Sequence, residues 1–168
     1  MSVEQAYIAL GSNLGDRREN LRVALSFLAE IDDVQLLAIS PIYENRAVGM
    51  GEASSFLNAV AKVEATLEPE SLLEHCLLIE AKLGRERSSS WQPRTMDLDL
   101  LIFGQRVLDS EQLVLPHPRI VERDFVLKPL MDLAPQMMLK GKRLKDWYAA
   151  LPEVELTPFA DVISLSEI

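Results

Sequence analysis

The chain has 168 residues, a length that fits one compact domain with a core of its own. Hydrophobic residues make up 48% and charged residues 26%, which is ordinary for a globular protein. The formal net charge of −9 argues against wide binding to nucleic acid, because such binding needs many cations to neutralise phosphates. A small anionic substrate held by a local arginine cluster remains compatible with this charge. We expect a single domain over residues 1–168.

Cysteine usage and hydropathy indicate the compartment. The single cysteine, Cys76, rules out an internal disulfide, and its apolar neighbours indicate a buried, inert thiol in a reducing cytosol. The N-terminal residues show no signal peptide, and no run reaches the roughly 18 apolar residues of a membrane span. We therefore expect a cytoplasmic protein that binds neither membranes nor nucleic acid, and a monomer rather than an oligomer.

The first part of the chain alternates strand and helix patterns. Residues 6–10 have the composition of a short buried strand. Asp16, with Glu19 three residues later, resembles a capping box at the start of a helix. A second strand is predicted over residues 34–43, where Pro41 places the end of the strand near a sheet edge.

A strand of clear alternation follows a loop predicted at residues 44–55. From Leu57 to Ala65, apolar side chains share one face and polar ones, such as Asn58, share the other. Helical spacing, apolar runs, prolines and glycines predict the later elements. These are a helix from Pro69 to Gly84, a strand at 97–103, a tight turn at 104–105, and helices at 125–134 and 144–150.

The order strand, helix, strand, strand, helix, strand is that of a ferredoxin-like sandwich. This is an α+β fold with an antiparallel sheet and helices packed on its faces. The first two helices would cover one face of the sheet, which leaves the other face for ligands and for the C-terminal elements. Fold alone assigns no function, because this architecture carries many.

Two aspartates interrupt an otherwise apolar predicted strand. Side chains alternate along a strand, so Asp97 and Asp99 point to one face with their Cα atoms roughly 7 Å apart. Leu98, Leu100 and Ile102 would point to the other face, into the core. Two adjacent carboxylates repel unless a cation lies between them, and oxygen-only ligands favour magnesium beside phosphates. The pair predicts a magnesium site, with a solvated strand end as the plainer interpretation.

An arginine-rich loop leads directly into this pair. Arg85, Arg87 and Arg94 precede the aspartates, with Trp91 and three serines among them. Arginines clamp phosphate oxygens while aspartates hold the magnesium that bridges phosphates, so both halves of a phosphoryl-transfer site adjoin. Two plainer interpretations stay open: a salt bridge from Arg94 to the aspartates, and cations that only decorate a helix C-terminus.

A histidine lies in a stiff segment further along the chain. Pro116 and Pro118 flank His117, and Arg119 and Arg123 follow it. A lone histidine is more often structural than catalytic. A histidine that prolines hold beside two arginines indicates a placed phosphate contact.

Short segments spread over most of the chain form one recognisable set. They are Tyr7–Gly15, Phe56–Ala59, Ile79–Glu80, Gly84–Arg87, Trp91–Asp99, Pro116–Pro118 and Arg123–Phe125. In these residues the chain resembles the 6-hydroxymethyl-7,8-dihydropterin pyrophosphokinase family, to which the segment Pro-Arg-Thr-x-Asp-Leu-Asp is highly specific. The resemblance covers about residues 7–135 in the family's order, and residues 136–168 add nothing to it.

The resemblance implies transfer of diphosphate from ATP to the hydroxymethyl group of 6-hydroxymethyl-7,8-dihydropterin, with release of AMP, in folate biosynthesis. It implies that Asp97 and Asp99 hold two Mg2+ ions, and that Arg85 and Arg94 act with them as catalytic residues. The implied contacts of the co-substrate ATP are Glu80, Arg85, Trp91, Arg94, Leu100, His117 and Arg123. The implied contacts of the pterin are Val48, Phe56, Asn58, Trp91 and Phe125, with the two phenylalanines sandwiching its ring.

The sequence departs from the family's usual pattern at a few positions. Residues 45–47 are Asn-Arg-Ala in place of a Thr-Pro-Pro-like run, so this segment is expected to be less stiff. Ser88–Ser90 lacks a further basic residue, Leu77 replaces a frequent polar nucleotide contact, and Phe56 replaces a common tyrosine. None of these changes affects the two aspartates.

Two other functions fit parts of the same pattern. One is a different two-metal enzyme of phosphoryl or nucleotidyl transfer, and the other is a non-catalytic ferredoxin-like ligand-binding domain. The acidic balance counts against a nucleic-acid substrate. The aromatic pair Phe56 and Phe125 favours a site for a small heterocycle.

Overall fold

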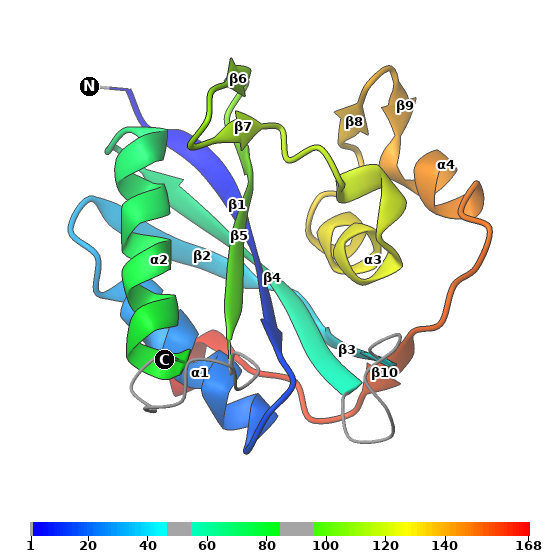
Figure 1. Cartoon of the computed structure of the whole chain (residues 1–168), viewed down its shortest axis with the longest axis horizontal. Coiled ribbons are helices and arrows are strands. Elements are labelled where there is room, and N and C mark those ends of the chain that lie inside the picture. Colours follow the sequence, from blue (N-terminus) through cyan, green and yellow to red (C-terminus); the bar gives the residue numbers. More distant parts are fainter. Residues whose placement is uncertain (1, 47–54, 85–95) are drawn as a thin grey trace.

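The computed structural model describes residues 2–46, 55–84 and 96–168, and Figure 1 shows how the elements are arranged. The strands are β1 (Glu4–Ser12), β2 (Val34–Ile39), β3 (Ile42–Arg46), β4 (Ser55–Ala65), β5 (Asp97–Phe103), β6 (Leu108–Asp109), β7 (Val114–Leu115), β8 (Met138–Leu139), β9 (Lys142–Arg143) and β10 (Thr157–Phe159). The helices are α1 (Arg17–Ala29), α2 (Pro69–Gly84), α3 (Asp124–Leu133) and α4 (Leu144–Ala149), with 3-10 turns at Ile120–Glu122 and Leu165–Glu167. None of the helices in the described ranges is long and apolar enough to cross a membrane.

The main sheet is built around β1 and β4, which pair antiparallel from Glu4 and Ala65 to Ser12 and Leu57. β5 pairs with the other side of β1. β2 and β3 both pair with the other side of β4, and β10 pairs with β3, all antiparallel. The resulting order, β10-β3-β4-β1-β5 with β2 beside β4, confirms the predicted ferredoxin-like α+β fold.

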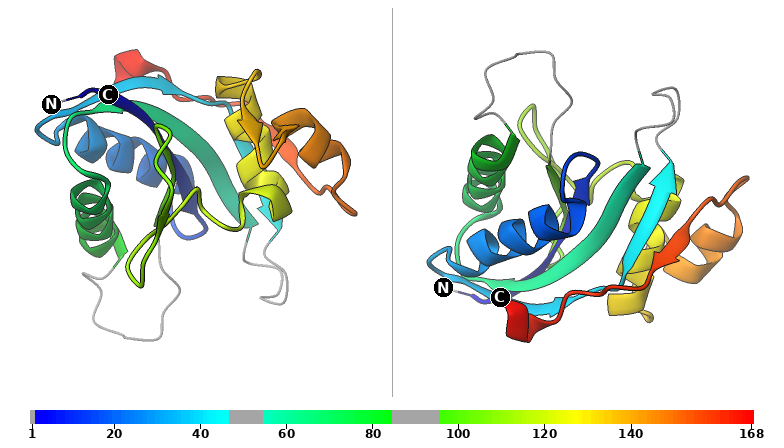
Figure 2. Two further views of the ribbon diagram at one scale, coloured as in Figure 1. Left: turned by 90° about the horizontal axis from the view of Figure 1, so that it is seen from above. Right: turned by 90° about the horizontal axis from the view of Figure 1, so that it is seen from below.

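Each face of the sheet carries a helical layer. Figure 2 shows α1 and α2 on one face, and α3 and α4 on the other. In β1, Ala6, Ile8 and Leu10 pack toward α1 and α2, whereas Tyr7 and Ala9 pack with α3. We call these two apolar clusters the first core and the second core. The prediction that α1 and α2 cover one face is therefore confirmed, and α3 and α4 lie on the other face as predicted, whereas Ile163 near the C-terminus packs in the first core instead.

The strand predicted over residues 34–43 is divided in two. Ser40 and Pro41 separate β2 from β3, and Pro41 has no backbone N–H to donate to a neighbouring strand. Ser40 still holds this break against β4, because its N–H donates to the Val60 carbonyl at 2.9 Å and its Oγ accepts the Val60 N–H at 2.8 Å. β3 then continues to Arg46, so residues 44–46 belong to a strand and the loop prediction was wrong for them. Ser55 is the first residue of β4, so the loop prediction was wrong for it too, and residues 47–54 of that prediction lie outside the described residues.

The side-chain alternation of β5 is broken once. Ile8 pairs with Leu100 but Tyr7 pairs with Ile102, so Leu101 is an extra residue in the ladder, a β-bulge. Leu100 packs in the first core as predicted, whereas Ile102 packs in the second core. The prediction for Ile102 was wrong because strict alternation assumes a strand without a bulge.

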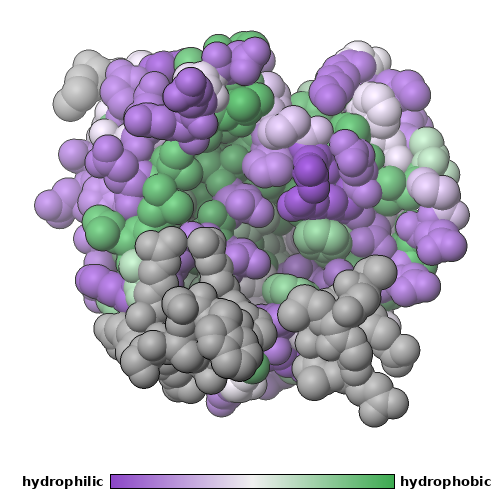
Figure 3. All heavy atoms as spheres, in the orientation of Figure 1, coloured by the Kyte–Doolittle hydropathy of each residue, from purple (hydrophilic) through white to green (hydrophobic). Residues whose placement is uncertain are grey.

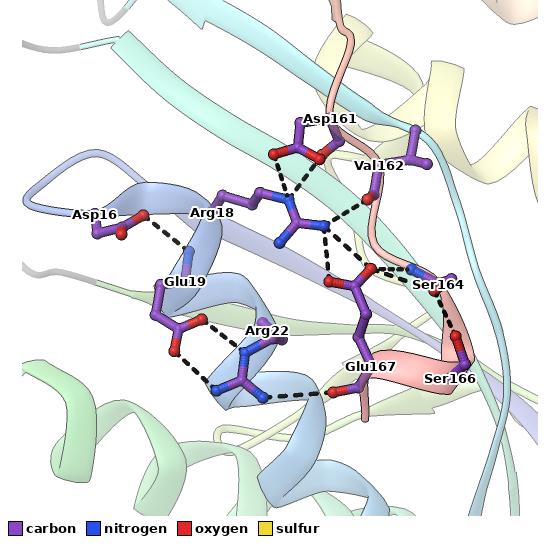
Figure 4. A network of polar contacts seen from close by, with 9 residues as sticks. All are labelled: Asp16, Arg18, Glu19, Arg22, Asp161, Val162, Ser164, Ser166 and Glu167. Atoms are coloured by element: carbon purple, nitrogen blue, oxygen red, sulfur yellow. Dashed lines mark hydrogen bonds and ion pairs between the residues drawn. The ribbon is translucent and has the colours of Figure 1, made fainter.

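The C-terminal segment, outside the family resemblance, is tied back onto α1. After β10, Ile163 enters the first core. Arg18 Nη2 donates to the Val162 carbonyl at 2.6 Å and to Glu167 Oε1 at 2.9 Å. Figure 4 shows this network, together with the predicted helix cap in which Asp16 accepts the Glu19 backbone N–H at 3.1 Å. Residues at the two ends of the chain thus share one packed structure.

The buried C-terminal isoleucine yields a stability prediction. Ile163 is 4% exposed, so Ile163→Ala should lower the free energy of unfolding by about 2–4 kcal/mol through the cavity it leaves. Val162 is 51% exposed, and Val162→Ala should change that free energy by less than about 0.5 kcal/mol. Urea unfolding followed by circular dichroism measures both. Equally small effects would show that this segment is not part of the cooperative fold.

Candidate active site

Four positions form a row across the sheet on the face of the second core. Asp97 of β5 is the register partner of Gly11 in β1, and Gly11 is the partner of Asn58 in β4. Asn58 is also the partner of Tyr43 in β3. Directly opposed residues of antiparallel strands project to the same face, so a carboxylate and an amide flank Gly11. We call these four residues the site row.

Gly11 leaves the centre of the site row flat. A methyl group at Gly11 would lie 3.4 Å from Asn58 Oδ1 and 3.6 Å from Phe56 Cδ2. Both side chains therefore turn toward the space above Gly11. Phe56 and Asn58, which the sequence resemblance links to one ligand, therefore lie together on β4, and β1 separates them from the strand that carries the aspartates.

The two aspartates lie half-buried at the start of β5. Arg123 Nη1 lies 3.9 Å from Asp99 Oδ2, so a cationic side chain approaches the pair. In the part of the chain that the structure describes, no group of three or more histidines, cysteines and acids could hold a metal ion. Two neighbouring carboxylates nevertheless fit Mg2+, which keeps several waters and takes further oxygen ligands from substrate phosphates.

The start of α3 places an arginine and an aromatic ring on the face of the site row. The Arg123 guanidinium carbon lies 5.6 Å from the ring centroid of Phe125, the second residue of the helix. The Tyr43 hydroxyl donates to the Asp132 carboxylate and so joins β3 to the far part of α3. Burial and this bond raise the pKa of Tyr43, so the hydroxyl keeps the proton that it donates. Because Tyr43 belongs to the site row, the bond fixes α3 relative to the site.

A cavity of about 350 Å³ opens along the outer edge of β5, between α2 and β7. On the face in view, Figure 3 shows hydrophobic side chains gathered between α2 and β5. Cavities of this size and apolar character take small molecules. We call it the edge cavity. Its lining residues are Leu73, Leu77, Glu80, Leu98, Asp99, Leu100, Gln112, Leu113, Val114, His117 and Pro118.

Glu80 joins α2 to the strand of the aspartates. Its side chain is buried, and Oε2 accepts the backbone N–H of Leu98 at 2.8 Å. Backbone N–H groups on the outer edge of a terminal strand have no neighbouring strand to bond to. The bond to Glu80 therefore anchors β5 at Leu98, the residue between Asp97 and Asp99. Cys76 lies one turn earlier on α2, fully buried, and burial raises its pKa to about 12. The prediction that Cys76 is buried is confirmed.

His117 is held at the edge cavity by two backbone bonds. Its N–H donates to the Leu101 carbonyl at 2.8 Å, and its Nδ1 accepts the Arg119 N–H at 3.1 Å. Burial lowers the pKa of His117, with Asp99 acting against this and Arg123 and Arg119 acting in the same direction. Because Nδ1 accepts, the neutral ring carries its proton on Nε2, which can donate to an anion.

The structure separates the predicted site residues into two groups. Phe56, Asn58 and Phe125 lie on the face of the site row, whereas Glu80, Leu100 and His117 lie at the edge cavity. Asp99 lies between the two groups. It lines the edge cavity, and its carboxylate lies near Arg123 on the face of the site row. The predictions for Val48, Arg85, Trp91 and Arg94 fall outside the described residues.

Several residues of the site were missed from the sequence. Tyr43 and Asn45 lie beside Asn58 on β3. Alternation would have indicated Asn45 if the predicted strand had continued past residue 43, whereas Tyr43 lay within that strand but its pairing with Asn58 had no local signal. The apolar wall formed by Leu73, Leu113 and Val114 had no local signal, because it comes from separate elements.

The ferredoxin-like fold, the paired aspartates and the aromatic residues beside Asn58 match what the sequence leads us to expect of a phosphotransferase that accepts a small heterocycle. A comparison with protein families matches residues 7–135 to the family described as 7,8-dihydro-6-hydroxymethylpterin-pyrophosphokinase (HPPK). The chain belongs to this family.

Individual relatives agree with this membership. The chain is 40% identical over 151 residues to the 2-amino-4-hydroxy-6-hydroxymethyldihydropteridine pyrophosphokinase of Pseudomonas aeruginosa, covering 89% of this chain and 93% of the relative. It is 46% identical over 132 residues to the enzyme of the same name from Bacillus subtilis, covering 79% of each. Among solved structures, wild-type HPPK-DHPS of Plasmodium falciparum with pterin and p-hydroxybenzoate matches with a TM-score of 0.66 at 16% identity, which supports the fold. The match covers 88% of this chain and 43% of that longer chain.

The environment of His117 predicts a pH dependence of stability. Because its pKa is lower in the folded protein than in the unfolded chain, its contribution is complete above about pH 6.5 and is lost as the pH falls further. In magnesium-free buffer, the stability advantage of the wild type over His117→Gln should therefore shrink between about pH 7.5 and about pH 5.5. Urea unfolding at several pH values measures this difference. A difference between the wild type and His117→Gln that stays constant over this pH range would contradict the prediction.

Proposed function

We propose that the pterin binds over Gly11 in the site row and that the nucleotide binds in the edge cavity. The activity of the chain is that of its family: it transfers diphosphate from ATP to the hydroxymethyl group of 6-hydroxymethyl-7,8-dihydropterin and releases AMP, in folate biosynthesis. One observation carries the placement. Asp97 and Asn58 flank Gly11 in register, two strand spacings or about 10 Å apart, and a flat bicyclic ring fits in this gap.

On the pterin side, Asn58 would bind the edge of the ring and Phe56 and Phe125 would stack on its faces. Both phenylalanines are half-buried on the face of the site row, so each keeps a surface for a ligand. Flat heterocycles gain from stacking on aromatic rings. The Arg123 guanidinium beside Phe125 supports the ring from outside and leads toward Asp99.

On the nucleotide side, the base would lie between the apolar walls of the edge cavity. Leu77 and Leu100 belong to these walls and supply apolar surface for the base. Asp99 belongs to the same cavity, so a nucleotide bound there has its phosphates close to the aspartates. His117 Nε2 and the Arg123 guanidinium are placed to donate to phosphate oxygens.

Asp97 and Asp99 would hold Mg2+, and we propose two ions, beside the ATP phosphates. When bound, the metal offsets the negative charge of the phosphates. The hydroxymethyl oxygen attacks the β-phosphorus of ATP in line, and the bond from this phosphorus to the oxygen of the α-phosphate breaks as AMP leaves. Arg123 stabilises the charge that develops, and Arg85 and Arg94 are proposed for the same task from the sequence. Holding both substrates in line is the main contribution of the chain.

Other features are proposed from the sequence alone. They are Val48 and Trp91 as ligand contacts, a single domain over residues 1–168, a monomer, and a cytoplasmic location. The single, buried Cys76 and the small substrates support the cytoplasmic location.

The aspartates are tested by substitution. Asp97→Ala and Asp99→Ala should each lower the rate of pterin-dependent AMP formation by about 100-fold or more at saturating Mg2+, because several kcal/mol of charge stabilisation are lost. The matched control Asp109→Ala removes an exposed aspartate of β6 and should keep the wild-type rate. An assay for AMP with and without 6-hydroxymethyl-7,8-dihydropterin measures the coupled reaction. Near-normal turnover in either site variant would refute the metal site.

The stacking role of Phe125 makes a separate prediction. Phe125→Ala should weaken pterin binding by about 1–3 kcal/mol, the range for a lost aromatic contact, and leave the affinity for an ATP analogue nearly unchanged. Phe27→Ala, on α1 at the opposite face, serves as the control and should change neither affinity. Calorimetry of both ligands measures these effects. If both affinities fell equally, Phe125 would be a core residue only.

A further inference from the structure

Neighbours on β3 and β4 hold the amide of Asn58 in one orientation. Its Nδ2 donates to the backbone carbonyl of Tyr43 at 3.2 Å and lies 3.4 Å from that of Phe56. Backbone carbonyls only accept hydrogen bonds, so the end of the amide that faces them must be the NH2 group. The carbonyl end, Oδ1, therefore turns the other way, toward the space above Gly11.

Asn45 completes this arrangement. Its Oδ1 accepts from Asn58 Nδ2 at 2.5 Å, the shortest of the three contacts. The NH2 group has two hydrogens, and the closer acceptors, Tyr43 O and Asn45 Oδ1, engage both. Asn58 is 5% exposed, so a hydrogen without a good partner there would be costly. Without the Asn45 acceptor, only the longer contacts of 3.2 Å and 3.4 Å to the Tyr43 and Phe56 carbonyls would hold the NH2 group, and the amide orientation would be less strongly fixed.

We propose that Asn45 is a specificity-determining positioning residue that keeps the Asn58 oxygen, and not its NH2 group, facing the heterocycle. This proposal rests on the proposed placement of the pterin over Gly11. A 2-amino-4-hydroxy pteridine, as in the names of the relatives, offers its 2-amino group and a ring N–H as donors to such an oxygen. A heterocycle with an acceptor at that edge would meet a lone pair and bind poorly.

Equilibrium binding tests the proposal without turnover. Calorimetry with a non-hydrolysable ATP analogue and Mg2+ compares 6-hydroxymethyl-7,8-dihydropterin with its 2-deamino analogue. The wild type should prefer the pterin by about tenfold, the value of one net hydrogen bond. In Asn45→Ala this preference should fall to about threefold or less, with the affinity for the ATP analogue unchanged. Asn45→Asp still presents an acceptor to Asn58 Nδ2 and should keep the preference.

The preference is the ratio of the affinities of one variant for the pterin and for its 2-deamino analogue. A smaller folded fraction lowers both affinities equally, so a merely structural role of Asn45 would not change the ratio. An unchanged preference in Asn45→Ala would overturn the proposal, and so would an equal loss in Asn45→Asp and Asn45→Ala. In an Asn58→Ala background, Asn45→Ala should have no further effect. If Asn58→Ala itself left pterin affinity and preference unchanged, the placement of the pterin over Gly11 would be wrong. That result is distinguishable from a failure of Asn45 alone.

Discussion

Antiparallel pairing of β4, β1 and β5 is the constraint on which the site depends. A slip of β5 by one residue against β1 would turn Asp97 and Asp99 into the first core and expose Leu98 to the ligand face. Leu98 and Leu100 are 3% and 2% exposed, so that slip would exchange buried leucines for buried carboxylates. Burying an unpaired carboxylate is far more costly than burying a leucine is favourable, so only one register is accessible. The apolar pattern that builds the first core thereby also places the aspartates beside Gly11.

Local patterns were enough to predict most of the fold. Helical spacing and the Asp16 cap are properties of short segments, and alternation in β4 depends only on which face is buried. The failures came where one strand depends on another. Leu101 is extra only because of how β5 meets β1, and β3 extends past residue 43 to Arg46 as a strand paired with β4. No pattern within one segment of sequence carries that information.

The site was predictable in its residue types but not in its geometry. The aspartates and Asn58 belong to recognisable motifs, yet their meeting across Gly11 requires a strand order that single motifs do not contain. The hydrogen bonds that hold the elements of the site together could not be predicted from the sequence. Glu80 resembled a nucleotide contact, but it also binds the edge of β5 through Leu98. Such bonds join elements that are far apart in sequence, which is why composition and spacing do not indicate them.

β3 shows how the parts of the fold outside the active site contribute to it. An edge strand with free backbone groups is a poor base for a precise hydrogen bond, and β3 carries Asn45. On the face of the first core, Arg17 Nη1 donates to Glu44 Oε2 at 2.6 Å. The hydrogen bonds from Arg17 and from the Ser55 hydroxyl lower the pKa of Glu44. On the opposite face Tyr43 holds α3, and along the outer edge β10 pairs with β3. The C-terminal segment lies outside the family match and supplies no proposed ligand contact, yet its strand covers the edge that would otherwise leave Asn45 loosely held. If Asn45 orients Asn58 as proposed, the contribution of this segment to pterin recognition is mechanical: pairing of β10 with β3 makes the strand that carries Asn45 more rigid.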